Sequence, residues 1–425
     1  MAYDIIVGRD DSDRKKYGKE SVVFLGKSYV KMGQNVSLSN NVYLDVNRSH
    51  TVMLCGKKGS GKSYSLGAIA EEMVSLPKEI KDKLSVLIFD TMGIFWTMKY
   101  ANTKEEDLLD TWNLKPKQLK DIQVFIPEGS FEDYKKKGMD VDKPFSIKPS
   151  ELKGDDWCNV FGISLNEPLG ILIERTISSF KKNFTIQEII EKIKVDEKSN
   201  QEIKNAAENR FLAASKWGLF SEKGTEIKEL VSNGKVSVLD VSCYTGVYGV
   251  WGIRSLVIGL ISRKLFEERM KVRKKEELEK IKGSSLEKKK KEMPNVWILI
   301  DEAAEFLPKN GKTAATDSLI QVIREGRQPG ISLILATQQP GEIHNDVITQ
   351  SDIIISHRLT AKNDIEALNN MMQTYLVGDI QKYLNDLPDL KGSAVILDDN
   401  SERMYPIRVR PKFTWHGGEA PTVLG

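Results

Sequence analysis

The residues of this chain best suited to chemistry lie in one short loop with the spacing Gly-x-x-x-x-Gly-Lys-Ser. The loop and the residue after it are Gly56, Lys57, Lys58, Gly59, Ser60, Gly61, Lys62, Ser63 and Tyr64. Glycines allow successive backbone N–H groups to turn inward around a phosphate chain, and a helix starting there adds positive potential. In such a loop Lys62 reaches the β and γ phosphates, and the Ser63 hydroxyl binds Mg²⁺. The loop therefore predicts a site for ATP and Mg²⁺.

The segments on both sides of the loop fit this interpretation. Residues 51–55 form an apolar run typical of a buried strand, and residues 65–74 resemble a helix. The alternative is a chance loop rich in glycine and lysine, which would not require a strand before it and a helix after it. We therefore expect strand, phosphate loop and helix in that order.

Two acidic residues supply the second half of the predicted site. Residues 296–300 form another apolar run, followed directly by Asp301 and Glu302. An acidic residue at the carboxyl end of a parallel strand lies in the ligand crevice. Asp301 would hold Mg²⁺ through its water shell, and Glu302 would polarise the attacking water as general base. A solvated strand end would look the same, but combined with the loop the pair predicts hydrolysis.

A third apolar run ends in a candidate sensor of the γ-phosphate. Residues 331–337 precede Gln338, which is the best-placed polar side chain, with Thr337 second. An ordinary polar loop start remains the alternative. Further buried runs cover residues 85–90, 122–126, 236–241 and 352–356. Such runs are typical of parallel strands buried on both faces, so the chain is predicted to be α/β, with a mostly parallel sheet between helices.

Arg324 and Arg327 lie three residues apart, just before the run 331–337. On a helix these two side chains share one face. In oligomeric ATPases an arginine at such a position can cross to a neighbour's γ-phosphate and raise the rate by stabilising charge. The alternative is a basic helix end that complements the helix dipole. The residues alone leave both interpretations open.

Four segments together resemble the HerA–FtsK superfamily of hexameric ATP-driven DNA pumps, and the closer match is to HerA-like ATPases. They are GKKGSGKS, ILIDEAAEFLP, IREGRQPGISLILATQQP and SDIIISHRLTAKND. The resemblance covers roughly residues 47–95 and 235–410, and it implies a RecA-like P-loop core.

The resemblance also assigns roles. It implies that Lys62 and Ser63 bind nucleotide and metal, that Asp301 and Glu302 form the hydrolytic pair, and that Gln338 is the sensor. Between the two arginines it favours Arg327 as the one that acts in trans. It further implies a hexameric ring that moves along double-stranded DNA without sequence preference, with a separate, NurA-like nuclease as partner in end processing, repair or defence.

The domain organisation expected from the sequence has five parts. They are a short barrel-like β domain (1–46), the first part of the core (47–150), an inserted helical subdomain (151–230), the second part of the core (231–410) and a tail (411–425). In the first part, strands are expected at 4–7, 21–30, 36–38 and 42–45, with Gly26, Gly33 and Asn40-Asn41 at turns. In the insert, Thr185 and Glu188 suggest a helix N-cap.

Several charged or aromatic segments have two interpretations. Residues 267–292, dense in Lys and Glu, are expected as a solvated helical hairpin or as a basic arm that contacts DNA phosphates or a partner protein through residues 288–291. Lys309 and Lys312 could face a ring's pore or form a plain surface turn. Trp415 and His416 could contact another chain, or the tail could be disordered.

Composition limits the remaining choices. The net charge of +3 does not by itself indicate nucleic acid, and the three separated cysteines favour neither a disulfide nor zinc. There is no run of about 20 apolar residues and no signal-peptide core, so a cytoplasmic protein without a membrane span is expected. Two alternatives to a DNA translocase stay open: a motor for another polymer and a slow, nucleotide-switched assembly factor. Glu302 argues against the second.

Overall fold

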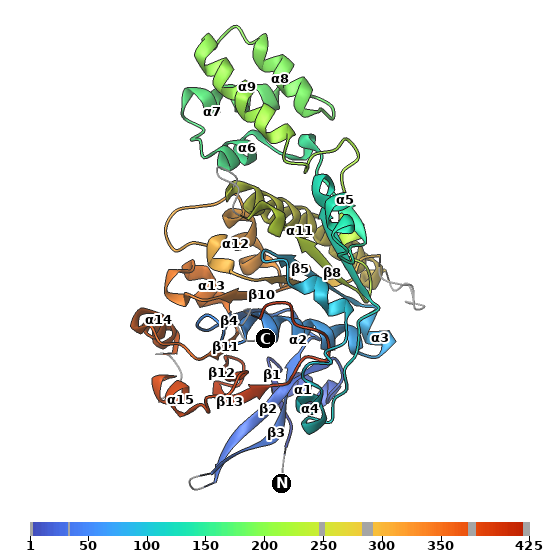
Figure 1. Cartoon of the computed structure of the whole chain (residues 1–425), viewed down its shortest axis with the longest axis vertical. Coiled ribbons are helices and arrows are strands. Elements are labelled where there is room, and N and C mark those ends of the chain that lie inside the picture. The colour runs from blue at the N-terminus through green and yellow to red at the C-terminus, as the bar shows by residue number, and fades with distance from the viewer. Residues whose placement is uncertain (1–2, 33–34, 246–250, 283–291, 373–379, 420–425) are drawn as a thin grey trace.

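The computed structural model describes residues 3–32, 35–245, 251–282, 292–372 and 380–419. One sheet of 13 strands runs through the molecule in the order β1-β3-β2-β13-β12-β11-β4-β10-β9-β5-β8-β6-β7 (Figure 1). The strands are β1 (Ile5–Val7), β2 (Val22–Met32), β3 (Asn35–Asp45), β4 (Thr51–Cys55), β5 (Leu84–Asp90), β6 (Ile122–Pro127), β7 (Lys143–Phe145), β8 (Val236–Asp240), β9 (Asn295–Ile300), β10 (Ile331–Thr337), β11 (Ile353–His357), β12 (Ser393–Asp398) and β13 (Arg403–Val409).

The strands from β11 to β7 in this order are all parallel to their neighbours. Strands β12, β13, β2 and β3 extend the sheet through antiparallel pairs. The mostly parallel sheet predicted from the apolar runs is therefore confirmed. In the centre, β4 lies between β11 and β10, and β9 follows β10, so the carboxyl ends of the candidate site's strands meet along one edge.

The helices cover both faces of this sheet. The α-helices are α1 (Asp11–Tyr17), α2 (Lys62–Ser75), α3 (Lys78–Lys81), α4 (Glu106–Thr111), α5 (Glu128–Lys136), α6 (Gly154–Phe161), α7 (Pro168–Ser178), α8 (Ile186–Lys194), α9 (Gln201–Ser215), α10 (Ile227–Leu230), α11 (Trp251–Ile281), α12 (Thr316–Glu325), α13 (Asn345–Gln350), α14 (Lys362–Met372) and α15 (Ile380–Asp386). Short 3₁₀ turns lie at Phe95–Lys99, Pro149–Glu151, Ser242–Tyr244, Ala303–Glu305 and Pro340–Glu342.

Two apolar cores form because successive strand residues point to opposite faces. In β4, Val52 and Leu54 pack with residues of α2 on one face, whereas Met53 and Cys55 pack with residues of α11 and α12 on the other. Burial on both faces explains why these strands read as continuous apolar runs rather than alternating ones. The core thus holds the strand before the phosphate loop from both sides.

The N-terminal segment differs from the expected barrel-like domain. Its strands extend the main sheet, because β2 pairs with β13, and residues 36–38 and 42–45 belong to one strand, β3. Gly26 lies inside β2 rather than at a turn. A Cβ there would lie 2.1 Å from the carbonyl oxygen of Arg408, so glycine permits the close approach of β13. The sequence pattern showed strands but not the distant strand that they join.

Helices α6 to α9 gather at the end of the molecule opposite the β2–β3 hairpin (Figure 1). The predicted N-cap is confirmed, since the Thr185 side chain accepts from the backbone N–H of Glu188 and the Glu188 carboxylate accepts from that of Thr185. Residues 267–281 continue the long helix α11, and residues 283–291, where the expected hairpin would turn, lie outside the described residues. The predicted contact at 288–291 lies outside the described residues.

The C-terminal segment 410–416, here called the C-terminal strap, also corrects an expectation. A disordered tail was one of the two interpretations, but residues 410–414 are buried against α2 of the same chain. Their burial depends on pairing with charges far away in the sequence, which a local pattern does not reveal.

Candidate active site

The phosphate loop follows β4 and leads into α2, which begins at Lys62. Gly61, the residue before the helix, has φ +108°, a conformation that side chains other than glycine rarely adopt. At Gly56 an added Cβ would lie 2.7 Å from the Cβ of His357, so the loop packs closely on β11. Strand, loop and helix therefore have the arrangement that phosphate binding requires.

Lys62 and Ser63 are both directed into the predicted site. The Lys62 ammonium is buried and donates to the carbonyl oxygen of Lys57 at 3.2 Å within the loop. Burial lowers the pKa of Lys62, opposed by the nearby charges of Glu302 and Asp301. The Ser63 hydroxyl donates to Asp301 Oδ2 at 2.5 Å, which joins residues 238 positions apart. The loop and the acidic pair thus form one site, as the spacing predicted.

Asp301 and Glu302 follow β9 at the same edge of the sheet. Glu302 has the left-handed backbone conformation, with φ +53° and ψ +45°, and its N–H donates to Asp301 Oδ1 at 3.0 Å. This turn separates the two carboxylates, so that Asp301 contacts Ser63 whereas Glu302 contacts Gln338. Burial raises the pKa of both carboxyl groups.

The Gln338 side chain donates its amide to Glu302 Oε1. The Thr337 hydroxyl is buried and accepts from the N–H of Gln339 at 3.1 Å. Of the two sensor candidates, Gln338 is therefore the one in contact with the candidate general base. Its hydrogen bond lowers the pKa of Glu302 and so opposes the effect of burial.

This contact predicts the pH dependence of hydrolysis. A general base must be ionised, so kcat will fall as the pH decreases through the raised pKa of Glu302. Gln338→Ala removes the hydrogen bond that lowers this pKa, so the midpoint of the kcat–pH profile will move to higher pH. The profile should be measured between about pH 5 and 8. Gln339→Ala, at the exposed neighbouring amide, is the matched control. A Gln338→Ala profile that superposes on that of the wild type would contradict the assignment.

Arg324 and Arg327 lie at the opposite, amino edge of the sheet, before β10. Seven strand residues separate that edge from Gln338, a span of about 20 Å. Arg324 pairs with Asp346 at 2.7 Å, and Arg327 pairs with Asp352 at 3.3 Å. The Arg327 side chain is 74% exposed. Neither arginine therefore reaches the phosphate loop of its own chain.

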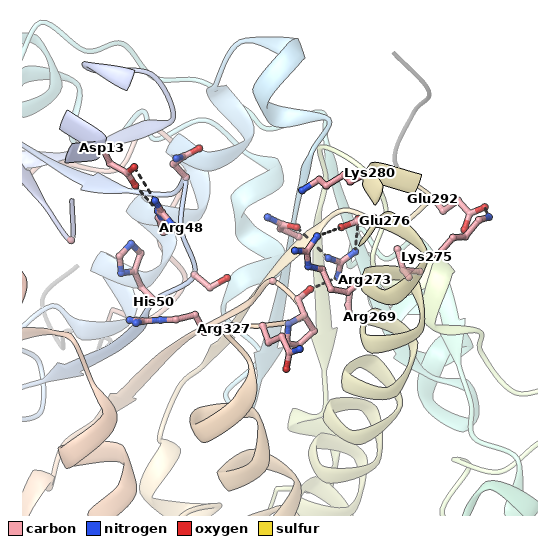
Figure 2. Close-up of a pocket in the computed structure, with 18 of the residues that line it drawn as sticks. Asp13, Arg48, His50, Arg269, Arg273, Lys275, Glu276, Lys280, Glu292 and Arg327 are labelled. Carbon is pink, nitrogen blue, oxygen red and sulfur yellow. Dashed lines mark hydrogen bonds and ion pairs between the residues drawn. The ribbon is translucent and has the colours of Figure 1, made fainter. Parts of the chain in front are cut away.

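Arg327 lines a cavity of about 640 Å³ at this edge (Figure 2). His50 lies beside it and bonds to two carboxylates, Asp352 at 2.6 Å and Asp45 at 3.2 Å. Burial opposes the charge of His50, but these two carboxylates outweigh it and raise its pKa to about 9. The charged imidazole fixes Asp352, the carboxylate with which the exposed Arg327 pairs.

Lys309 and Lys312, for which a pore position and a plain surface turn were both open, belong to a loop that is joined to the segment after Gln338. Lys309 donates through its backbone to Glu342 at 2.8 Å and through its ammonium to the carbonyl oxygen of Gly341 at 3.1 Å. An isolated β-bridge pairs Pro308 with Ile343. A second cavity, of about 540 Å³, is lined by this loop together with Glu302 and Gln338. Lys312 is exposed and pairs with Asp317.

Sequence reasoning missed the C-terminal strap as a part of this site. Glu71, in the middle of α2, accepts from Arg410 and from the backbone N–H groups of Phe413 and Thr414. The Tyr64 hydroxyl accepts from the N–H of Lys412 at 2.7 Å and donates to Glu105 at 2.7 Å. A glutamate inside an otherwise apolar helix face was the available signal. The strap fixes the helix that carries the phosphate loop.

We expect this buried network to contribute strongly to stability. Glu71→Gln removes the charge opposite the buried Arg410, and breaking a buried pair costs about 3–5 kcal/mol. The free energy of unfolding should be measured by urea denaturation, with the exposed Glu79→Gln as control. Equal midpoints for both variants would contradict a structural role of the strap.

Within the described residues, no group of three or more His, Cys, Asp or Glu side chains is arranged to hold a metal ion. No helix in the described part of the chain is both long and apolar enough to span a membrane.

Fold and site together define a P-loop ATPase: a mostly parallel α/β sheet with the phosphate loop, the acidic pair and Gln338 at the carboxyl ends of β4, β9 and β10. The chain belongs to the family described as "Helicase HerA, central domain", whose model matches residues 30–246.

Three proteins with similar sequences are described as HerA helicases of DNA double-strand break repair. The chain is 22% identical to the DNA double-strand break repair helicase HerA of Sulfurisphaera tokodaii over 375 residues, which is 85% of this chain and 66% of the relative. It is 26% identical to that of Pyrococcus furiosus over 142 residues, and 33% identical to a probable one of Methanocaldococcus jannaschii over 69 residues. These two matches span 32% and 16% of this chain but only 24% and 14% of the relatives' lengths.

Among solved structures, VirB4 of Thermoanaerobacter pseudethanolicus resembles the fold. The TM-score is 0.57 at 12% identity, with 93% of this chain and 98% of that chain covered. At this identity the similarity concerns the fold alone.

Proposed function

We propose that this chain is an ATP-driven motor that assembles into rings, translocates along double-stranded DNA and works with a partner nuclease in DNA end processing, repair or defence. One observation carries the proposal. The hydrolytic residues lie at the carboxyl edge of the sheet, whereas the exposed Arg327 lies at the amino edge, about 20 Å away. One chain therefore carries both the hydrolytic residues and the arginine of such a site but keeps them apart. This arrangement is suited to a ring, in which the arginine of one subunit completes the site of the next.

Hydrolysis follows from the side chains at the carboxyl edge. The loop N–H groups and Lys62 bind and orient the phosphates of ATP. Ser63 and Asp301, with oxygens 2.5 Å apart, are the residues that would hold Mg²⁺. Bound there, Mg²⁺ neutralises charge on the phosphate oxygens. Glu302 takes a proton from the attacking water, and Gln338 links its position to the γ-phosphate.

Arg327 of a neighbouring subunit would stabilise the charge that develops on the transferred phosphoryl group. Its contact with Asp352 is exposed and 3.3 Å long, so little free energy holds it in place. The contact with His50 keeps Asp352 itself fixed while the arginine exchanges partners. Site completion then depends on assembly.

Movement of DNA requires a link between hydrolysis and a DNA contact. The loop around Lys309 and Lys312 is joined to the segment after Gln338 by backbone hydrogen bonds. A shift of Gln338 on loss of the γ-phosphate would therefore move these lysines. Contacts of lysine with DNA phosphates depend on salt and not on sequence.

Steady-state ATP hydrolysis with and without linear duplex DNA, at low and moderate salt, tests this proposal. The particle mass should be measured by light scattering on the same sample. We expect a ring-sized particle whose hydrolysis rises with DNA and loses that response as salt increases. A ring that ignores DNA would favour a motor for another polymer, such as those of conjugation and secretion. A monomer would leave Arg327 without a site to complete.

A further inference from the structure

The phosphate loop has two flanks, and only one of them is used by the hydrolytic residues. On that flank, Ser63 contacts Asp301. On the other flank, Gly61 faces Gly392, since a Cβ on Gly61 would lie 3.7 Å from the Gly392 nitrogen. ATP bound with its γ-phosphate at the acidic pair must direct its sugar and base away from that pair. The nucleoside therefore leaves the loop on the second flank, at the start of α2.

Tyr64 is the aromatic side chain that α2 presents there. Its ring meets the ring of His416 edge to face, with 5.2 Å between the centroids. Burial lowers the pKa of His416 to about 4, so its imidazole is neutral at physiological pH. A neutral, flat ring is suited to a nucleobase rather than to a phosphate, which would require a charged donor.

The C-terminal strap fixes this aromatic pair in relation to the loop. Lys412 N–H donates to the Tyr64 hydroxyl at 2.7 Å, and the N–H of Trp415 donates to the carbonyl oxygen of Tyr100 at 2.8 Å. Thr97 Oγ1 donates to the carbonyl oxygen of Trp415 at 3.1 Å. The N–H and the carbonyl group of Trp415 are therefore both hydrogen-bonded to the segment after β5. His416, the next residue, is half-buried and lies beside Tyr64 of α2.

We propose that Tyr64 and His416 form the binding surface for the nucleoside of the triphosphate, so that the C-terminal strap supplies base contact to the ATP site of its own chain. The inference rests on the nucleotide-binding part of the proposed function and not on DNA translocation. Contact of the nucleobase with one aromatic ring is expected to increase the affinity for ATP about tenfold. The phosphate contacts are separate, since they come from residues 56–63.

Two probes separate the nucleoside from the phosphates: ATP, and inorganic tripolyphosphate, which has no nucleoside. Their Kd values should be measured by calorimetry with Mg²⁺ for the full chain. His416→Ala is expected to raise the Kd of ATP about tenfold and to leave that of tripolyphosphate within about twofold. His416→Phe should retain ATP affinity. His344→Ala, which changes a histidine at the start of α13, is the control and should change neither value.

Three results would overturn the inference. They are an unchanged Kd for ATP in His416→Ala, an equal loss for both probes, and a wild-type chain that binds ATP no better than tripolyphosphate. An equal loss would mean that the strap only shapes the loop. All three leave the DNA proposal untouched, and hydrolysis that ignores DNA would remove that proposal without affecting these binding measurements.

Discussion

Glu302→Gln will bind ATP with wild-type affinity and lower kcat about 10³-fold. Glutamine keeps the size of the side chain but cannot accept a proton from water. Lys62, Ser63 and Asp301, which bind the phosphates and Mg²⁺, are unchanged. Equilibrium binding of ATP and steady-state hydrolysis should be measured on the same preparation.

Glu305→Gln is the matched control for this variant. Glu305 lies three residues farther along the same segment and pairs with Arg254 at 2.9 Å. Its kcat should stay within about threefold of wild type, as expected for a partly exposed ion pair. A Glu302→Gln variant that turns over at the wild-type rate would remove Glu302 from its role as base.

Arg327→Ala will also lower kcat by about 10³-fold, and mixing it with Glu302→Gln will restore part of the activity. In a mixed ring, a subunit with intact Glu302 can receive the intact Arg327 of its neighbour. A random one-to-one mixture contains about a quarter of such interfaces. Hydrolysis should be titrated across mixing ratios after the rings have been allowed to exchange subunits.

Arg324→Ala distinguishes the two arginines. If Arg327 is the residue that acts in trans, Arg324→Ala removes only an exposed ion pair with Asp346. Loss of activity in Arg324→Ala but not in Arg327→Ala would reverse the assignment. If assembly is intact and no mixture recovers activity, the arginine does not act across an interface.

The site at the carboxyl edge of the sheet was predictable because each of its parts has a local sequence pattern. Glycine spacing marks the loop, and apolar runs that end in Asp301 or Gln338 mark the neighbouring strands. The side-chain contacts between residues 63 and 301 and between 302 and 338 then follow from the parallel strand order. The parallel sheet itself was predictable for the same reason, since burial on both faces leaves a distinct composition.

Two features could not be read from local patterns. The N-terminal strands were recognised, but their partner β13 lies nearly 400 residues away and makes them part of the main sheet. The C-terminal strap was taken for a tail because residues 411–425 are rich in Gly and Pro and lack a core pattern. Arg410 pairs with Glu71 and the Lys412 N–H donates to Tyr64, and both partners lie more than 300 residues earlier. Charged residues buried by distant pairing carry no local apolar signal.

Displacement of a third strand from duplex DNA would show whether this chain translocates. A short triplex-forming oligonucleotide is placed on a linear duplex, and its release is followed by fluorescence. We expect release that requires ATP, with delays that lengthen with distance from the DNA end, and no release by Glu302→Gln. ATP hydrolysis stimulated by DNA without any release of the third strand would contradict the proposal that this chain moves along duplex DNA.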